Sequence, residues 1–344
     1  MNKVERNSAH ELLRLLAMFF IVWYHLISYY LYFIPHDNSF DYMLEATLPS
    51  LHIGVILFLL ISGYYGIKPS LNGFMRLLAI IIIYYLPVEI IRCLHHHGSL
   101  LDTLMFMTNT PYWFIRTYLF LYVLTPVINK FTSTSSSRLC NYVMIAIAIV
   151  AIYFGTTQGD PSLEDGKNVV NFMFLYLLGF SVRRYQYKWN NIRSIWIFCM
   201  FVTVNVILIG SLLFYPRHTN IGDTLWLLAF PYCSPLLIFN ALLVFLIFSR
   251  FKIQSHIINS LASSTFAVYL IHCHPAVHKY IIMPLMGYYV ANSICPPPVH
   301  VFVISIAGAI LVMIGSILID KALYPVWKLE TISRNYLLKR IGCR

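Results

Sequence analysis

Apolar residues run in long stretches along this chain, and short polar segments separate them. A transmembrane α-helix needs about 20 mostly apolar residues. Ten stretches approach or exceed that length, at roughly 11–33, 50–67, 74–93, 112–131, 139–156, 168–185, 194–215, 224–249, 265–286 and 299–320. We find no internal repeat or linker between them. The pattern predicts one all-α membrane domain over residues 1–344, a bundle of about ten transmembrane helices with its core at 11–323.

The charged residues indicate how this bundle is oriented. With the N-terminus in the cytoplasm, 19 of the 24 Lys and Arg and four of the 13 Asp and Glu fall on the cytoplasmic side, a net charge of +15 there against −4 outside. Lys and Arg concentrate in cytoplasmic loops of membrane proteins. We therefore predict that both termini are cytoplasmic. The basic tail, 324–344, is expected to lie on membrane lipid.

Composition supports the same class and excludes others. The chain is 59% hydrophobic and 11% charged, whereas soluble domains carry about 25% charged residues. Its mean hydropathy is +0.71. The net charge of +11 follows from the cytoplasmic loops, so we expect no nucleic-acid partner. The seven cysteines contain no CxxC pair, and we expect them to pack as small apolar residues. Whether Cys93 and Cys295 form a disulfide stays open.

The first apolar stretch carries two ionisable residues, Arg14 and His25. Eleven residues at about 100° each make three turns and about 20°, so both side chains share one helix face, roughly 16 Å apart along the axis. Ionisable groups at membrane depth usually face a protein interior or a wet cavity. The pair therefore favours a cavity along this face. The alternative is an Arg14 that reaches the cytoplasmic surface and a His25 that is hydrogen-bonded in the interior.

Four motifs resemble the acyltransferase 3 family of integral membrane O-acyltransferases. They are Arg-x10-His at Arg14 and His25, "LFLLISGYY" in the second stretch, "YWFIRTYLFLYVLTPVI" in the fourth and "SSTFAVYLIH" in the ninth. The resemblance covers about 11–323. It implies an O-acyltransferase in the cytoplasmic (inner) membrane of a bacterium. The expected donor is an acyl-CoA, most simply acetyl-CoA, and the expected acceptor is a hydroxyl of a cell-surface carbohydrate or its lipid-linked precursor.

The chemistry assigns roles to residues. Histidine suits a general base because its unperturbed pKa is about 6.5, and arginine suits phosphates. We therefore expect His25 to be catalytic and Arg14 to bind the cofactor. The resemblance adds Ser62 to the expected cofactor-binding residues; it lies beside Gly63, where we expect another helix to approach closely. We also assign Arg76, at the inner end of the third stretch, to cofactor binding.

The outer half carries the expected acceptor site. Glu89 can pair with Arg92 at i+3, and by depth it is also the nearest partner for Arg116. A Glu89–Arg116 pair is either structural or borders a carbohydrate pocket. Our candidate substrate-binding residues are Glu89, Trp113, Arg116 and His272.

Two alternatives remain open. His274 and His278 have spacing that can bind a metal, but no third ligand is evident, and we expect no metal. Intramembrane His, Glu and Arg also mark transport pathways, so the alternative function is a membrane exporter of a glycan or small polar solute.

Overall fold

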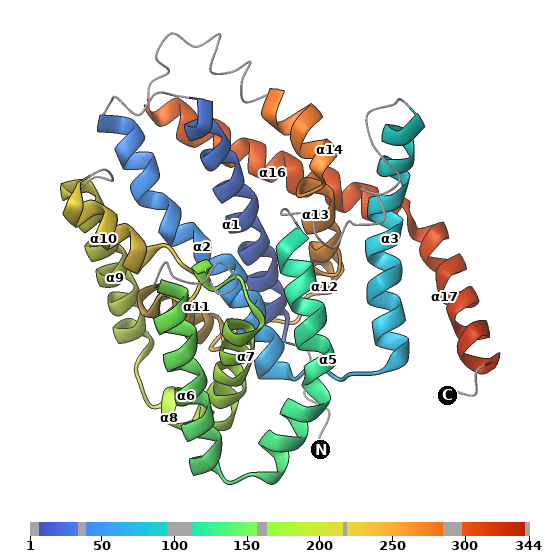
Figure 1. Ribbon diagram of the computed structural model, residues 1–344, viewed down its shortest axis with the longest axis horizontal. Coiled ribbons are helices and arrows are strands. Elements are labelled where there is room, and N and C mark those ends of the chain that lie inside the picture. Colours follow the sequence, from blue (N-terminus) through green and yellow to red (C-terminus); the bar gives the residue numbers. More distant parts are fainter. Residues whose placement is uncertain are drawn as a thin grey trace.

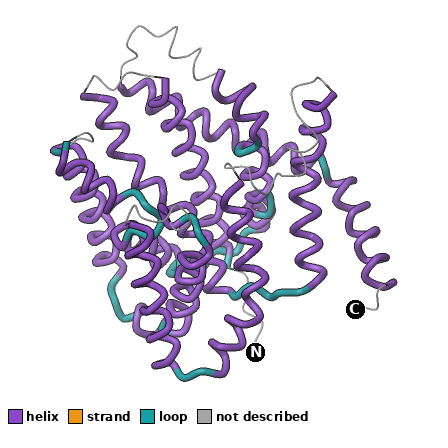
Figure 2. The backbone as a smooth tube through the Cα atoms, in the orientation of Figure 1, coloured by secondary structure: helices purple, strands orange, loops and turns teal. Residues whose placement is uncertain are grey.

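The computed structural model describes residues 7–33, 39–94, 112–156, 164–215, 219–284 and 298–340. These residues form helices joined by short loops, and no strand occurs in these ranges (Figure 2). The longer helices are α1 (Ser8–Phe33), α2 (Ser39–Tyr65), α3 (Leu71–Leu94), α5 (Trp113–Thr134), α6 (Ser137–Thr156), α7 (Val169–Arg184), α9 (Ser194–Phe214), α11 (Pro235–Phe248), α16 (Pro298–Ala322) and α17 (Tyr324–Arg340). The all-α prediction is confirmed.

Six of the helices in the described ranges are long and apolar enough to cross a membrane: α1, α2, α3, α6, α9 and α16. The chain is therefore a multi-pass membrane protein. The start of α1 and the end of α17 lie toward the same side of the bundle (Figure 1). The count of about ten spans and the cytoplasmic location of both termini stay predictions.

Helix α2 is the centre of the bundle. It packs against α1, α7, α9 and α11. Within an apolar 18-residue stretch of α2, 83% of the residues are buried inside the protein. Two glycines let α2 and α7 approach closely. A Cβ on Gly63 would meet the backbone of Tyr176, and a Cβ on Gly179 would meet the backbone of Leu60. Small residues at helix interfaces allow such backbone approach in membrane proteins, so the close packing expected at Gly63 is confirmed.

The second apolar stretch was placed at 50–67, but α2 already begins at Ser39. The added turns have an apolar face to bury. Leu44 and Leu48 are buried in a second, smaller core with Ile27 and Leu31 of α1. An apolar face packed on a neighbouring helix therefore stabilises helix outside the predicted apolar stretch.

Prolines divide two of the expected segments. The segment 224–249 becomes α10 (Asn220–Ala229) and α11, because Pro231 and Pro235 interrupt it. The apolar segment 265–286 does not form one continuous helix. It splits into α13 (Thr265–His272), α14 (Pro275–Val277) and the π-helical η4 (His278–Ile282). Pro275 lacks the N–H that would continue α13, and the Nδ1 atom of His274 accepts a hydrogen bond from the backbone N–H of Ala276 at 3.1 Å.

The basic tail forms a helix that packs beside α3 (Figure 1). The ring of Trp327 lies 5.9 Å from that of Tyr84 on α3. Arg334, which is buried, pairs with Glu330 at 2.6 Å. This tail therefore contacts the bundle, and its association with lipid stays a prediction.

Candidate active site

A cavity of about 530 Å³ lies between α1, α2, α5 and α13. Its walls are mainly aromatic and aliphatic, and a few polar side chains reach into it. A mostly apolar cavity with a few convergent polar groups is typical of a small-molecule site. Both Arg14 and His25 line it, which confirms that their shared helix face borders a cavity.

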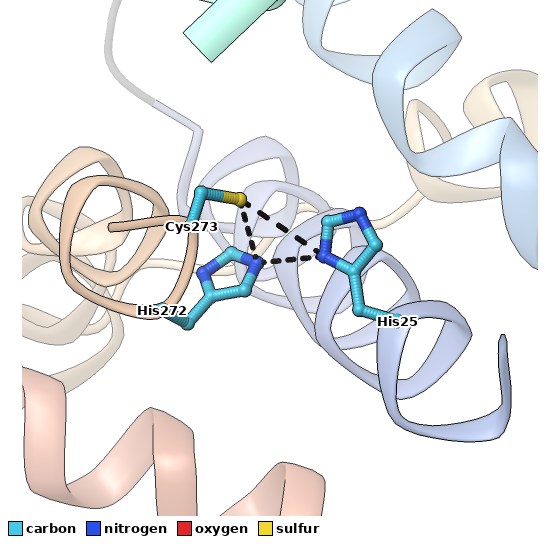
Figure 3. A group of neighbouring side chains, drawn as sticks. All are labelled: His25, His272 and Cys273. Atoms are coloured by element: carbon cyan, nitrogen blue, oxygen red, sulfur yellow. Dashed lines mark hydrogen bonds between the residues drawn. The ribbon is translucent and has the colours of Figure 1, made fainter. Parts of the chain in front are cut away.

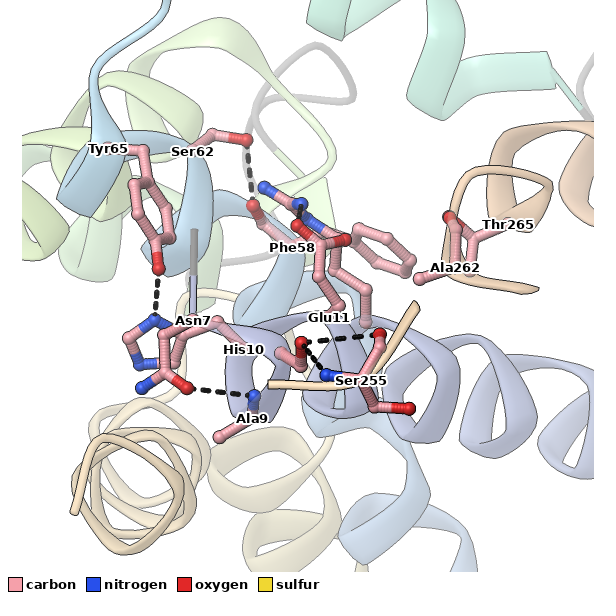
Figure 4. Close-up of polar contacts among 12 residues, drawn as sticks. Asn7, Ala9, His10, Glu11, Phe58, Ser62, Tyr65, Ser255, Ala262 and Thr265 are labelled. Atoms are coloured by element: carbon pink, nitrogen blue, oxygen red, sulfur yellow. Dashed lines mark hydrogen bonds and ion pairs between the residues drawn. The ribbon is translucent and has the colours of Figure 1, made fainter. Parts of the chain in front are cut away.

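Arg14 lies at one end of this cavity with two hydroxyl residues. Its Nη1 atom is 2.5 Å from Oε1 of Glu11, one turn earlier on α1. Figure 4 shows Glu11, Ser62 of α2 and Thr265 of α13 at this end; Ser62 donates to the carbonyl of Phe58 at 2.8 Å. Arg14 keeps 27% of its side chain exposed. Because a guanidinium has five N–H donors, the pair with Glu11 leaves donors that can face an anion.

His25 lies further along α1 and touches α13 (Figure 3). Its Nδ1 atom is 3.1 Å from Nε2 of His272. The Nδ1 atom of His272 is in turn 2.7 Å from the carbonyl oxygen of Val268. The ring of Tyr29 stacks on that of His25 at 6.0 Å. His272 is 2% exposed and does not line the cavity.

These contacts fix where the protons lie when both imidazoles are neutral. A carbonyl oxygen only accepts, so Nδ1 of His272 donates to Val268 and its Nε2 must accept. His25 Nδ1 is then the donor to His272, which leaves the lone pair of His25 on Nε2. That atom makes no hydrogen bond with any described residue and points away from His272 (Figure 3). A histidine held in this tautomer presents a base to the cavity.

Of the other expected site residues, Ser62 and Trp113 also line the cavity. Arg76 does not. It borders a second cavity of about 380 Å³ with Asp320 and Trp327. Phe266 lines both cavities, so the two are neighbours across one ring.

The expected Glu89–Arg116 pair is wrong. Nη1 of Arg92 lies 2.8 and 2.9 Å from the two carboxylate oxygens of Glu89, as the i+3 spacing allows, and Nε2 of His274 is 3.7 Å from Oε1 of Glu89. Glu89 is fully buried, whereas Arg116 is exposed on α5. The prediction matched Glu89 and Arg116 by their depth along two helices, and depth does not show which side of each helix faces the other. Neither Glu89 nor Arg116 lines the main cavity.

Cys273 is the functional candidate that the sequence did not indicate. It is buried, lines the cavity, and its Sγ atom lies 3.3 Å from Nε2 of His272 and 4.0 Å from Nδ1 of His25. These three residues gather imidazole and thiol ligands within 4.8 Å of one another. His274 and His278, whose spacing could bind a metal, do not form such a group in the described ranges. Pro275 was the one sequence signal that α13 ends near Cys273, because a proline cannot continue the hydrogen bonding of that helix.

Comparison with known proteins identifies the chain. The family model described as an acyltransferase domain, acyltransferase 3, matches residues 7–320. No curated protein and no solved structure matches the chain. The matched region contains every residue that lines the main cavity. The chain therefore belongs to the acyltransferase 3 family of membrane acyltransferases.

Proposed function

We propose that this protein is an O-acyltransferase of a bacterial inner membrane, which transfers an acetyl group from acetyl-CoA to a hydroxyl of a cell-surface carbohydrate or its lipid-linked precursor. The observation that carries this proposal is the shared cavity, with Arg14 at one end and the free Nε2 lone pair of His25 further along. The two lie roughly 16 Å apart along the helix axis. An extended pantetheine arm spans a comparable length.

Arg14 binds the donor in this account. Its guanidinium pairs with phosphate oxygens of the coenzyme, for which planar donors are well matched. Ser62 lies beside it and offers a hydroxyl to the same end of the donor. Arg76 borders the adjoining cavity and supplies a second cation for the nucleotide end. The apolar walls between Arg14 and His25 then enclose the pantetheine arm.

His25 carries out the chemical step. Its Nε2 atom takes the proton of the acceptor hydroxyl as that oxygen attacks the thioester carbonyl carbon. The carbon–sulfur bond breaks, the coenzyme leaves as a thiolate, and the proton passes from His25 to that sulfur. The products are the acyl ester and free coenzyme A. His272 holds the His25 ring in the required tautomer, and Trp113 gives the sugar ring an aromatic face.

The test uses purified protein in lipid vesicles with acetyl-CoA labelled in the acetyl group. The proposal expects release of free coenzyme A that depends on added acceptor glycan, with label recovered on the glycan. Acetyl-CoA that neither binds nor loses its acetyl group would contradict the proposal. Passage of an unmodified glycan across the vesicle membrane would favour an exporter instead.

A further inference from the structure

The contact between α1 and the end of α13 brings together three side chains that bind metals in other proteins. The atoms are Nδ1 of His25, Nε2 of His272 and Sγ of Cys273 (Figure 3). Their separations are 3.1 Å between the nitrogens, and 3.3 and 4.0 Å from the sulfur to His272 and His25. No carboxylate belongs to this group.

These separations match the edges of a tetrahedral metal site. With metal–nitrogen bonds of about 2.0–2.1 Å and a metal–sulfur bond of about 2.3 Å, tetrahedral angles give ligand edges of about 3.3–3.6 Å. The observed edges of 3.1, 3.3 and 4.0 Å differ from these by a few tenths of an ångström. Small side-chain rotations therefore suffice to bind an ion.

The ligand chemistry and its surroundings narrow the choice of ion. Two imidazoles and a thiolate suit Zn²⁺ and similar first-row transition-metal ions, whereas Mg²⁺ and Ca²⁺ prefer oxygen ligands. Metal-bound histidines usually donate their other ring N–H to a carbonyl or carboxylate. His272 already does so, to Val268 at 2.7 Å. Cys273 follows the last residue of α13, so its position is set by the end of that helix.

We propose that His25, His272 and Cys273 form a Zn²⁺ site with its fourth position open to the main cavity. His25 and Cys273 line that cavity, so the vacant side of the tetrahedron faces it. Three protein ligands and an open position for water are typical of accessible zinc sites. The thiol proton leaves to solvent on binding, since the thiolate is the ligand.

Zinc binding and base catalysis both require the imidazole of His25. This consequence rests on the proposed function. A metal on Nδ1 of His25 uses the lone pair there, so the remaining ring proton occupies Nε2. That is the atom that must accept the hydroxyl proton. Zinc binding therefore inhibits acyl transfer, and the metal-bound and catalytic forms of His25 exclude each other.

Cobalt(II) provides a direct test because it substitutes for zinc and absorbs light when bound by a thiolate. Purified, metal-free protein is titrated with Co²⁺, beside Cys273→Ser and the control Cys140→Ser, which removes another buried cysteine outside the cavity. We expect a thiolate-to-cobalt charge-transfer band at one equivalent in wild type and Cys140→Ser, displaced by Zn²⁺ and absent in Cys273→Ser. Folded wild-type protein without that band, or a band that persists in Cys273→Ser, would overturn the site.

The activity measurement tests the inhibition separately. Each protein is compared with its own zinc-free rate. In wild type and Cys140→Ser, zinc at the concentration that displaces cobalt should lower the rate by about 10²-fold or more, the size of a general-base contribution, and a chelator should restore it. Zinc binding with an undiminished rate would overturn the inhibition. If no acyl transfer occurs at all, the proposed function fails while the cobalt spectrum still decides the metal site.

Discussion

Nδ1 of His25 lies 3.1 Å from Nε2 of His272, and this contact determines which nitrogen of His25 faces the cavity. Because His272 donates to Val268 through its other nitrogen, it can only accept from His25 when both rings are neutral. The pair therefore separates two roles. His25 exchanges the proton, and His272 positions it.

Replacing His272 tests this positioning role. His272→Ala should lower kcat by about tenfold or more, part of the 10²–10⁴-fold that a positioned base contributes, with little change in the KM for the acyl donor. His272→Gln should recover part of the loss, because its amide oxygen can accept the same hydrogen bond. A glutamine variant no better than alanine, with both folded, would argue that the ring only fills space.

Replacing Arg14 should act on donor binding. Hydrogen bonds to charged groups contribute about 1.5–3 kcal/mol, so Arg14→Ala should raise the donor KM by roughly tenfold to a hundredfold, and excess acetyl-CoA should partly restore the rate. Rates are normalised to folded protein because the change also removes the cation beside buried Glu11. Arg138→Ala, an exposed arginine on α6, is the control. A fall in kcat at saturating donor with unchanged KM would contradict this role.

The contact between α2 and α7 predicts a difference between two glycines. Gly63→Ala places a methyl group against the backbone of Tyr176, and overpacking typically costs about 1–3 kcal/mol. Nothing lies within 4 Å of a Cβ on Gly210, so Gly210→Ala should leave stability unchanged or slightly higher. Thermal unfolding in detergent measures both. Equal melting temperatures for the two variants would show that α2 and α7 do not approach as described.

The ion pair of Glu89 and Arg92 predicts a coupling within α3. Glu89 is buried and Arg92 keeps 23% of its side chain exposed, so removing one partner should cost less than the 3–5 kcal/mol of a fully buried pair, up to about 3 kcal/mol. A double-mutant cycle of Glu89→Gln and Arg92→Gln should show coupling in thermal stability. The same cycle with Arg116→Gln should show none. Coupling of Glu89 to Arg116 rather than Arg92 would contradict the pairing.

Local patterns predicted the features that depend on one helix or one close contact. The spacing of Arg14 and His25 predicted a shared face on a cavity, and Gly63 predicted a close helix approach. These follow from periodicity and backbone chemistry alone.

Contacts between distant segments could not be predicted in this way. Cys273 meets His25 across 248 residues of chain, and no spacing within one segment encodes that contact. Glu89 pairs with Arg92 inside α3, as the i+3 spacing allows, whereas the lack of a pair with Arg116 depends on which faces α3 and α5 turn toward each other, and several neighbouring helices determine that together. The second apolar stretch was placed from residue 50, but burial of Leu44 and Leu48 against α1 favours helix before it.

His25→Ala tests the role of His25 as the general base. The measurement is the acyl transferred per correctly folded molecule, with His256→Ala as the control because His256 is an exposed histidine at the start of α12 (His256–Ala262). Loss of a general base raises the barrier by about 3–5 kcal/mol. We expect a fall of about 10²–10⁴-fold in His25→Ala and none in His256→Ala. Near-wild-type turnover by folded His25→Ala protein would contradict the role of His25.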